Sequence, residues 1–403
     1  MAAGDVLKLH LENIASGGEA LGRIEGKPVF TEGGAPNETV LVRITQDKNT
    51  WARALLLEII KPSPLRVDPV CPYYGINAGS CAASCGGCNL LHINYQTQIN
   101  AKISILKELF LKIAALDLQE IEVVSYQDYD PFEYRNRMQF HCLREKTKSV
   151  KSSFGLIGRK SGEIIAVNDC PVAEKGIRKL LNQNEKTARI TLPPEKDRFT
   201  IFSKDGILLN EGGFTRGKIK ILDKEIIIDA GVFFQSNCYM LEKLILEMRC
   251  IAEKANTNFP MADLYCGIGT FAFFLGDIFP DFILAEENKT AISIARENLK
   301  GQKADFFALK DSEWPRALLR KNARGFEFDF AVIDPPRAGL NRELAAALAQ
   351  NGPSLLAYVS CDAASLARDS KILTLGYKLI KIIFFDFYPQ TSHIESMAVF
   401  ERK

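Results

Sequence analysis

The chain has 403 residues, of which 47% are hydrophobic and 25% charged, and its formal net charge is +2. This composition is ordinary for a globular protein, and the length predicts about two to four domains. No apolar run reaches the ~18–20 residues of a membrane span, and the opening MAAGDVLKLH contains no apolar core of an export signal. We therefore expect a cytoplasmic protein, monomeric and without a membrane partner.

The near-neutral total hides a basic middle and an unusual set of cysteines. Residues 131–220 contain 19 Lys and Arg against 10 Asp and Glu, whereas residues 1–61 contain 7 against 8. Such an excess indicates either a solvated surface or a phosphate-binding face, and charge alone does not decide between them. Ten cysteines in a chain without an export signal argue against a disulfide framework and favour metal binding or thiol chemistry.

The N-terminal part shows three patterns in chain order. Residues 1–61 read as short alternating strands between Gly-rich turns, which is typical of a small OB-like β-barrel. Residues 62–92 form a proline-containing linker and a cysteine cluster. Residues 93–117 carry apolar side chains at helical spacing from Ile99 to Ile113, which predicts an amphipathic helix packed on the C-terminal domain.

The C-terminal part separates into two patterns. Residues 118–232 alternate strand-like runs with Gly and charged turns, so we expect a central α+β domain. Residues 233–403 alternate buried strands with helices. That alternation predicts a doubly wound, mostly parallel sheet of the Rossmann-like α/β class.

A glycine-containing loop follows the first buried strand of this sheet. Asp263-Leu-Tyr-Cys-Gly267-Ile-Gly269 opens a helix, and its glycines allow a sharp turn and a close approach to a ligand. Glu286, just past the next strand, is placed to accept hydrogen bonds from two ribose hydroxyls. The loop leaves NAD and S-adenosylmethionine open, although the leading Asp263 is more typical of methyltransferases.

Three further polar residues lie where predicted strands of the sheet end or begin. Asp334 and Cys361 each follow a buried strand, at the edge where open α/β sheets bind ligands. The alternative for Asp334 is a residue that caps a turn, and the alternative for Cys361 is a buried structural thiol. We expect a lowered thiol pKa and a nucleophilic role for Cys361. Glu395 stands among apolar residues beside His393, before the last strand.

These segments resemble one family. DLYCGIG, IDPPRAGL, YVSCDAASLARD and HIESMAVFERK are similar, in order, to the signatures of the S-adenosylmethionine-dependent RNA uracil-C5 methyltransferases. The resemblance covers nearly the whole chain. It implies that the N-terminal barrel is a TRAM domain, an RNA-binding module. The cysteine-rich segments resemble those of the iron–sulfur members, which include enzymes of large-subunit ribosomal RNA.

The resemblance implies a covalent mechanism. Cys361 would add as thiolate to C6 of uracil, which makes C5 nucleophilic enough to accept a methyl group. Glu395 would then remove the C5 proton so that the thiol can leave. The resemblance places five residues around the cofactor: Gln235, Tyr265, Gly267, Glu286 and Asp334. Of these, Asp334 would belong to the cofactor site or to the uracil site.

The spacing of the cysteines fits either zinc or an iron–sulfur cluster, since both accept four thiolates. The resemblance favours a [4Fe–4S] cluster bound by Cys71, Cys85, Cys88 and Cys170. The gap of 13 residues between Cys71 and Cys85 is longer than the family's usual one, and Cys81 inside it could replace either. Because uracil methylation needs no electron transfer, we expect a structural cluster.

The expected substrate is a specific uridine of 23S ribosomal RNA, whose phosphates the barrel and the basic domain would contact. The target base would have to leave its stack to reach the thiol. Three alternatives stay open. They are methylation of the T-loop uridine of transfer RNA, a catalytically inactive RNA-binding iron–sulfur protein, and an NAD-dependent oxidoreductase, in which Asp334 and Cys361 would have no obvious function.

Overall fold

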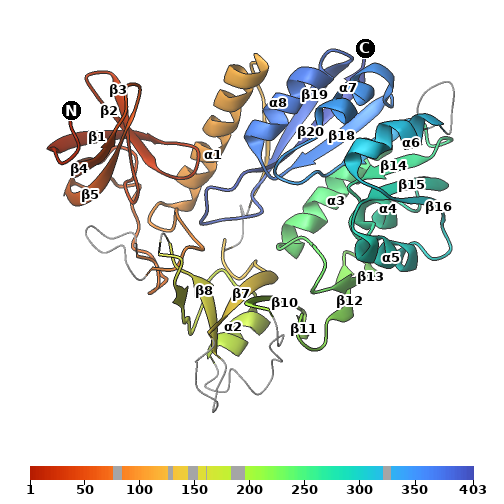
Figure 1. Ribbon diagram of the computed structural model, residues 1–403, viewed down its shortest axis with the longest axis horizontal. Helices are drawn as coiled ribbons and strands as arrows, with labels where there is room; N and C mark the ends of the chain where they lie inside the picture. Colours follow the sequence, from red (N-terminus) through yellow and green to blue (C-terminus); the bar gives the residue numbers. More distant parts are fainter. Residues whose placement is uncertain (76–83, 126–129, 144–152, 160, 183–195, 321–327) are drawn as a thin grey trace.

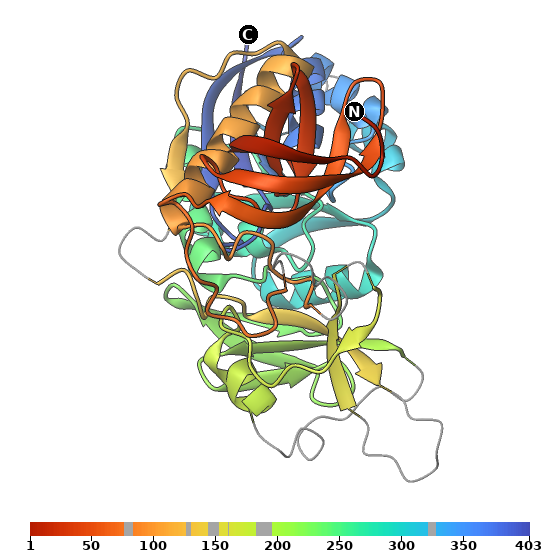
Figure 2. The ribbon, with the colours of Figure 1, turned by 90° about the vertical axis from the view of Figure 1, so that its left-hand side faces the viewer.

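The computed structural model describes residues 1–75, 84–125, 130–143, 153–159, 161–182, 196–320 and 328–403. Three bodies are visible: a small barrel, a central sheet, and a larger α/β domain that contains the C-terminus (Figure 1, Figure 2). The helix α1 stands between the barrel and the α/β domain (Figure 1). Within these ranges no helix combines the length and the apolar character needed to cross a bilayer.

The N-terminal body is a closed five-stranded barrel with the strand order β1-β2-β3-β5-β4. In β4 every second side chain points inward, so Val40, Val42 and Ile44 are buried while their neighbours are more exposed. Gly22 is required by packing, because a Cβ there would lie 2.2 Å from the carbonyl oxygen of His10. Its strands are β1 Val6–Ile14, β2 Ala20–Ile24, β3 Lys27–Thr31, β4 Thr39–Asp47 and β5 Ala52–Lys61.

The predicted amphipathic helix is α1, Tyr95–Leu109, which continues as a π-helical turn over Phe110–Ala114. The side chain of Asn94 caps its first turn by accepting a hydrogen bond from the backbone N–H of Thr97. Leu106 and Phe110 are fully buried in a core shared with α8 of the α/β domain. This shared core joins the helix to the α/β domain.

The central body is a five-stranded sheet in the order β11-β10-β7-β8-β9. Phe140, Phe154 and Phe199 form its core, and the ring of Phe154 packs edge-to-face on the other two with centroid distances of 5.2 and 5.4 Å. A separate hairpin, β12 and β13, follows. The elements are β7 Arg137–Leu143, β8 Ser153–Ile157, β9 Ile164–Ile165, α2 Lys175–Asn182, β10 Arg198–Lys204, β11 Ile207–Asn210, β12 Arg216–Ile221 and β13 Lys224–Asp229.

The α/β domain contains an eight-stranded sheet in the order β16-β15-β14-β17-β18-β20-β19-β6. Strands β14 to β18 are parallel, and β20 runs antiparallel to both β18 and β19. The chain moves from β14 towards β16 on one side and returns to β17 on the other. A crevice therefore opens between β14 and β17, at the point where doubly wound sheets bind ligands.

The strands of this sheet are β6 Glu122–Val124, β14 Met261–Leu264, β15 Asp281–Glu286, β16 Lys303–Ala308, β17 Phe330–Ile333, β18 Leu355–Ser360, β19 Tyr377–Phe385 and β20 Glu395–Arg402. Its helices are α3 Cys238–Ala252, α4 Thr270–Phe274, α5 Lys289–Asn298, η2 Asp311–Glu313, α6 Trp314–Arg320, α7 Arg342–Asn351 and α8 Ala363–Leu373. One strand departs from the sequence analysis, which assigned residues 118–232 to the central domain. The short β6 pairs in parallel with β19 and so forms an edge of the eight-stranded sheet.

Candidate active site

The crevice holds a cavity of about 540 Å³ at the carboxyl ends of β14, β15, β17 and β18. Parallel strands place the residues that follow them at one edge, so side chains far apart in sequence meet there. Glu395 joins them because β20 is antiparallel, and its first residue therefore lies beside the end of β18. The predicted catalytic and cofactor residues all line this cavity: Gln235, Tyr265, Gly267, Glu286, Asp334, Cys361 and Glu395.

The glycine loop has the backbone of a ligand-binding turn. Gly267 and Gly269 have φ values of 54° and 78°, and Tyr265 also lies in the left-handed region at 60°. The backbone N–H groups of Gly267 and Asn288 donate to the two carboxylate oxygens of Glu286, at 3.2 and 2.9 Å. Glu286 is thereby oriented at the end of β15, and its carboxylate retains lone pairs for ribose hydroxyls.

Two residues of this cavity, Asp311 and Trp314, were not predicted from the sequence. The hydroxyl of Tyr265 donates to Asp311 at 2.9 Å, and its ring meets Trp314 edge-on at a centroid distance of 4.5 Å. Both Asp311 and Trp314 line the cavity. The available signal was their position shortly after β16, which ends at the same edge of the sheet as β14 and β15.

The environment of Cys361 contradicts the expected lowering of its pKa. Burial raises the pKa of the thiol to about 12, and the nearby carboxyl groups of Glu395 and Asp334 add to the shift. Arg337 acts in the opposite direction but is outweighed. The expectation rested on the position of Cys361 at a strand end, and that position alone does not reveal how deeply the thiol is buried.

The two carboxyl groups facing the thiol are also perturbed. Glu395 is 3% exposed, and burial, followed by the proximity of Asp334, raises its pKa well above the usual value. Burial raises the pKa of Asp334 to about 7, although the amide of Gln235 donates to this carboxyl group at 3.4 Å. A carboxylate with a raised pKa is a stronger base once ionised, which suits a group that must remove a proton.

His393 lines the same cavity, two residues before Glu395. Burial, followed by the charge of Arg337, lowers its pKa to about 4, so its ring is neutral at pH 7. Nδ1 lies 3.3 Å from the guanidinium of Arg337, and the ring packs edge-on against Tyr388. These contacts fit a structural hydrogen-bonding role for this histidine.

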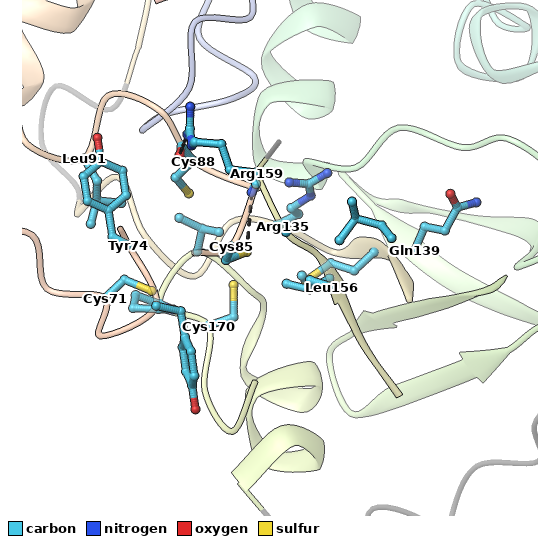
Figure 3. A pocket seen from close by; sticks show the side chains of 18 of the residues that line it. Cys71, Tyr74, Cys85, Cys88, Leu91, Arg135, Gln139, Leu156, Arg159 and Cys170 are labelled. Carbon is cyan, nitrogen blue, oxygen red and sulfur yellow. Dashed lines mark hydrogen bonds between the residues drawn. The ribbon is translucent and has the colours of Figure 1, made fainter. Parts of the chain in front are cut away.

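A second cavity, of about 400 Å³, lies between the linker and the central sheet. Its wall contains all the predicted cluster ligands: Cys71, Cys85, Cys88 and Cys170 (Figure 3). Burial, followed by the other thiols, raises the pKa of Cys88, and burial raises that of Cys170 to about 11. The four thiols therefore share one cavity and influence each other's protonation.

Hydrogen bonds to the central domain hold the cysteine segment in place. The N–H of Gly86 donates to Ile157 and that of Arg159 donates to Ser84, at 2.9 and 2.8 Å, and the guanidinium of Arg159 also donates to the carbonyl of Cys88. Among the described residues, no three His, Cys, Asp or Glu side chains are grouped tightly enough to hold a metal ion. The alternative ligand Cys81 lies outside the described residues.

Comparisons with known proteins agree with this architecture. The profile of the tRNA (uracil-5-)-methyltransferase family matches residues 200–403, and that of the TRAM domain matches residues 3–57. An uncharacterized RNA methyltransferase of Treponema denticola is 31% identical over 94% of this chain and 94% of its own. The 23S rRNA (uracil(1939)-C(5))-methyltransferase RlmD of Shewanella sediminis is 31% identical over 95% of this chain and 93% of its own.

Among solved structures, the tRNA (uracil-54, C5)-methyltransferase of Pyrococcus abyssi, in complex with S-adenosyl-L-homocysteine, matches with a TM-score of 0.72. It is 22% identical and covers 98% of this chain and 100% of its own, so the two proteins share their fold. The family profile spans just over half of the sequence, and the relatives align over nearly all of it. The chain is therefore a member of the tRNA (uracil-5-)-methyltransferase family, an S-adenosylmethionine-dependent RNA methyltransferase with an N-terminal TRAM domain.

Proposed function

We propose that this enzyme methylates C5 of a specific uridine in 23S ribosomal RNA. The observation that carries the chemistry is the meeting of Cys361, Glu395 and Asp334 with the glycine loop in one cavity. The RNA target is supported by relatives named for 23S rRNA, which align with nearly the whole chain. The intact set of reactive residues weighs against an inactive RNA-binding protein.

In the proposed mechanism, the thiol proton of Cys361 passes to solvent water, and the thiolate sulfur then forms a bond to C6 of the uracil ring. The electron pair of the C5–C6 double bond moves towards O4, and C5 then takes the methyl group. S-adenosylmethionine, when bound, supplies that methyl group and a positively charged sulfonium. Glu395 removes the C5 proton, the double bond re-forms, and the sulfur–C6 bond breaks, which restores the thiolate.

The cofactor residues follow from the same cavity. We assign Glu286 to the ribose hydroxyls, because its carboxylate is held at the end of β15 by two backbone N–H groups. Tyr265 and Gly267 form the turn against which the adenosine would lie, and Gln235 with Asp334 closes the side towards Cys361. A sulfonium bound in this cavity would favour the thiolate of Cys361 and so would offset part of the pKa increase that burial causes.

RNA contacts are assigned to the barrel and to the face around the cavity entrance. Phe233 is 61% exposed at the cavity, and the guanidinium of Arg137 lies 5.8 Å from the centre of its ring. An exposed aromatic ring beside a cation suits a flipped or unpaired nucleotide, since bases stack on rings and phosphates attract arginine.

For the second cavity we propose a structural [4Fe–4S] cluster bound by Cys71, Cys85, Cys88 and Cys170. The donor set is chemically suitable, because thiolates are the usual ligands of iron–sulfur clusters. Arg135 also lines this cavity and would offset part of the negative charge of the ligated cluster. The protein purified without air should be brown and contain about four irons and four sulfides per chain. A colourless protein with one zinc would contradict the proposal.

The substrate assignment is tested by mapping 5-methyluridine in total RNA by mass spectrometry, with and without the gene. One 23S rRNA position should lose its methyl group without the gene and regain it when the wild-type gene is returned. The Cys361→Ala gene serves as the control that should not restore it. Loss at the T-loop of transfer RNA instead would contradict the ribosomal assignment, and no loss at any uridine would contradict both.

A further inference from the structure

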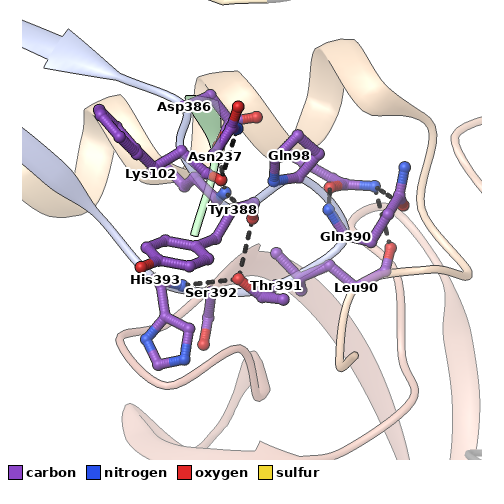
Figure 4. Close-up of polar contacts among 12 residues, drawn as sticks. Leu90, Gln98, Lys102, Asn237, Asp386, Tyr388, Gln390, Thr391, Ser392 and His393 are labelled. Atoms are coloured by element: carbon purple, nitrogen blue, oxygen red, sulfur yellow. Dashed lines mark hydrogen bonds and ion pairs between the residues drawn. The ribbon is translucent and has the colours of Figure 1, made fainter. Parts of the chain in front are cut away.

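Lys102 is a buried cation that comes from outside the catalytic sheet. It lies on α1, and its side chain is only 1% exposed. Its ammonium donates to the carboxylate of Asp386 at 2.6 Å and to the carbonyl oxygen of Tyr388 at 3.0 Å (Figure 4). Asp386 is itself fully buried, so this ion pair is excluded from solvent.

The loop that Lys102 holds leads directly to the proposed base. Residues 386–394 connect β19 to β20 and are called the base loop below. Phe385 of β19 pairs with Glu395 of β20. Asp386 directly follows Phe385 in the chain and is therefore close to Glu395 across the two strands. Tyr388 and His393 of the same loop line the catalytic cavity. A shift of the Lys102 contact would therefore move this wall of the cavity.

The base loop depends on contacts from α1 for its shape. Gln390 has a φ of 68°, a left-handed conformation that costs free energy in a residue other than glycine. The amide of Gln98 donates to the side chain of Gln390 and its oxygen accepts from the backbone N–H of Gln390, both at 2.9 Å (Figure 4). The side-chain oxygen of Asn89, which precedes α1 in the chain, accepts a hydrogen bond from the backbone N–H of Ser392 at 2.8 Å.

The burial of the charge argues for positioning rather than for stability alone. A buried ion pair is often no more stabilising than apolar side chains of similar size, because desolvation offsets the attraction. An apolar residue at position 102 could fill the space, but it could not hold both the carboxylate of Asp386 and the carbonyl of Tyr388. The ammonium fixes two points of the loop at once.

We propose that Lys102 is a positioning residue for Glu395, which it aligns with the substrate through Asp386 and the base loop. The inference rests on the proposed role of Glu395 as the base that removes the C5 proton. It places a determinant of the catalytic step on α1, which joins the barrel and cysteine segments to the catalytic domain.

The test compares Lys102→Met, the apolar pair Lys102→Met/Asp386→Leu, and Glu395→Gln. In both Lys102 variants kcat should fall about 10-fold or more, since small misplacements of a reacting group are costly, while KM for RNA and for the cofactor stays within about twofold. The unfolding midpoint should fall in the single variant and recover in the apolar pair. Lys112→Met is the matched control, because Lys112 is exposed and forms only a surface pair with Glu108.

The decisive measurement is the RNA–protein adduct that survives denaturation. Because base removal is the step affected, Lys102→Met should accumulate adduct as Glu395→Gln does. Recovery of kcat together with stability in the apolar pair would overturn the proposal, since the role would then be structural. Adduct with Glu395→Gln but not with Lys102→Met would overturn it too. Absence of adduct with Glu395→Gln would instead fault the base assignment, and the Lys102 role with it.

Discussion

The two cavities of this protein are assembled by different means. The catalytic cavity collects residues from the ends of adjacent strands of one sheet, and the register of the strands places them together. The cysteine cavity collects Cys71, Cys85 and Cys88 from a linker and Cys170 from the central domain. The first site is built by the fold itself, whereas the second depends on loops whose final geometry a bound metal would set.

The thiols of the two cavities differ in their neighbours. Cys361 faces two carboxyl groups and Arg337, so its protonation is coupled to that of Glu395, the proposed base, and of Asp334. Burial, followed by the thiols of Cys170, Cys85 and Cys71, raises the pKa of Cys88, and Arg135 acts in the opposite direction. Metal binding in the second cavity would therefore release protons, while thiolate formation in the first depends on what binds in the same cavity.

The largest effect is expected for Cys361→Ala. Turnover should fall by roughly 10³-fold or more, because removal of a nucleophile abolishes the covalent route. Affinity for S-adenosylhomocysteine, measured by calorimetry, should change less than about twofold, since Tyr265 and Glu286 are untouched. Cys250→Ala, an exposed cysteine outside both cavities, is the control with normal turnover. Retained methyl transfer by the Cys361 variant would remove the assigned nucleophile.

Cys88→Ala should remove the proposed iron–sulfur cluster from the cysteine cavity. Iron should fall from about four atoms per chain to below one, because a cluster missing a ligand is lost, and the unfolding midpoint should drop by about 5–10 °C. Chemical analysis and a melting curve measure both. Cys142→Ala is the matched control, since Cys142 is a buried thiol of the central core outside the cavity. Unchanged iron in the Cys88 variant would contradict the ligand set.

The same contrast explains what could be predicted from the sequence. The alternation of strands and helices predicts the sheet, and the strand ends then place Asp334 and Cys361 at one edge without any knowledge of distances. The base loop was not predictable in this way, because its position arises from packing against α1, which is distant in the sequence. The predicted lowering of the pKa of Cys361 was also wrong. The shift depends on the burial of the thiol, which a local motif does not reveal.

The raised pKa of Cys361 can be tested by alkylation. The thiolate reacts with iodoacetamide, and its fraction rises about tenfold per pH unit below the pKa. With a pKa of about 12, labelling of Cys361 in the cofactor-free enzyme should rise from pH 7 to pH 10 without a plateau. Mass spectrometry of the labelled peptide follows the rate, and the Cys361→Ala variant identifies it. A rate that levels off by about pH 10 would show instead an ordinary or lowered thiol pKa.

The smallest expected effect concerns Asp263, the buried residue beneath the glycine loop. Burial raises its pKa to about 8, and one carboxylate oxygen has no hydrogen-bond partner within the described part of the chain. Between about pH 4 and pH 8 the native protein therefore binds a proton that the unfolded chain lacks, so this group makes stability fall as pH rises. The unfolding midpoint of Asp263→Asn should match that of the wild type near pH 4 and exceed it at pH 8. Each kcal/mol of difference in the free energy of unfolding corresponds to a shift of roughly 2–4 °C. Asp277→Asn should behave oppositely, since the guanidinium of Arg249 lowers the pKa of Asp277 and its contribution is lost as pH falls. A pH-independent midpoint difference for Asp263→Asn would show that Asp263 is ionised beneath the loop.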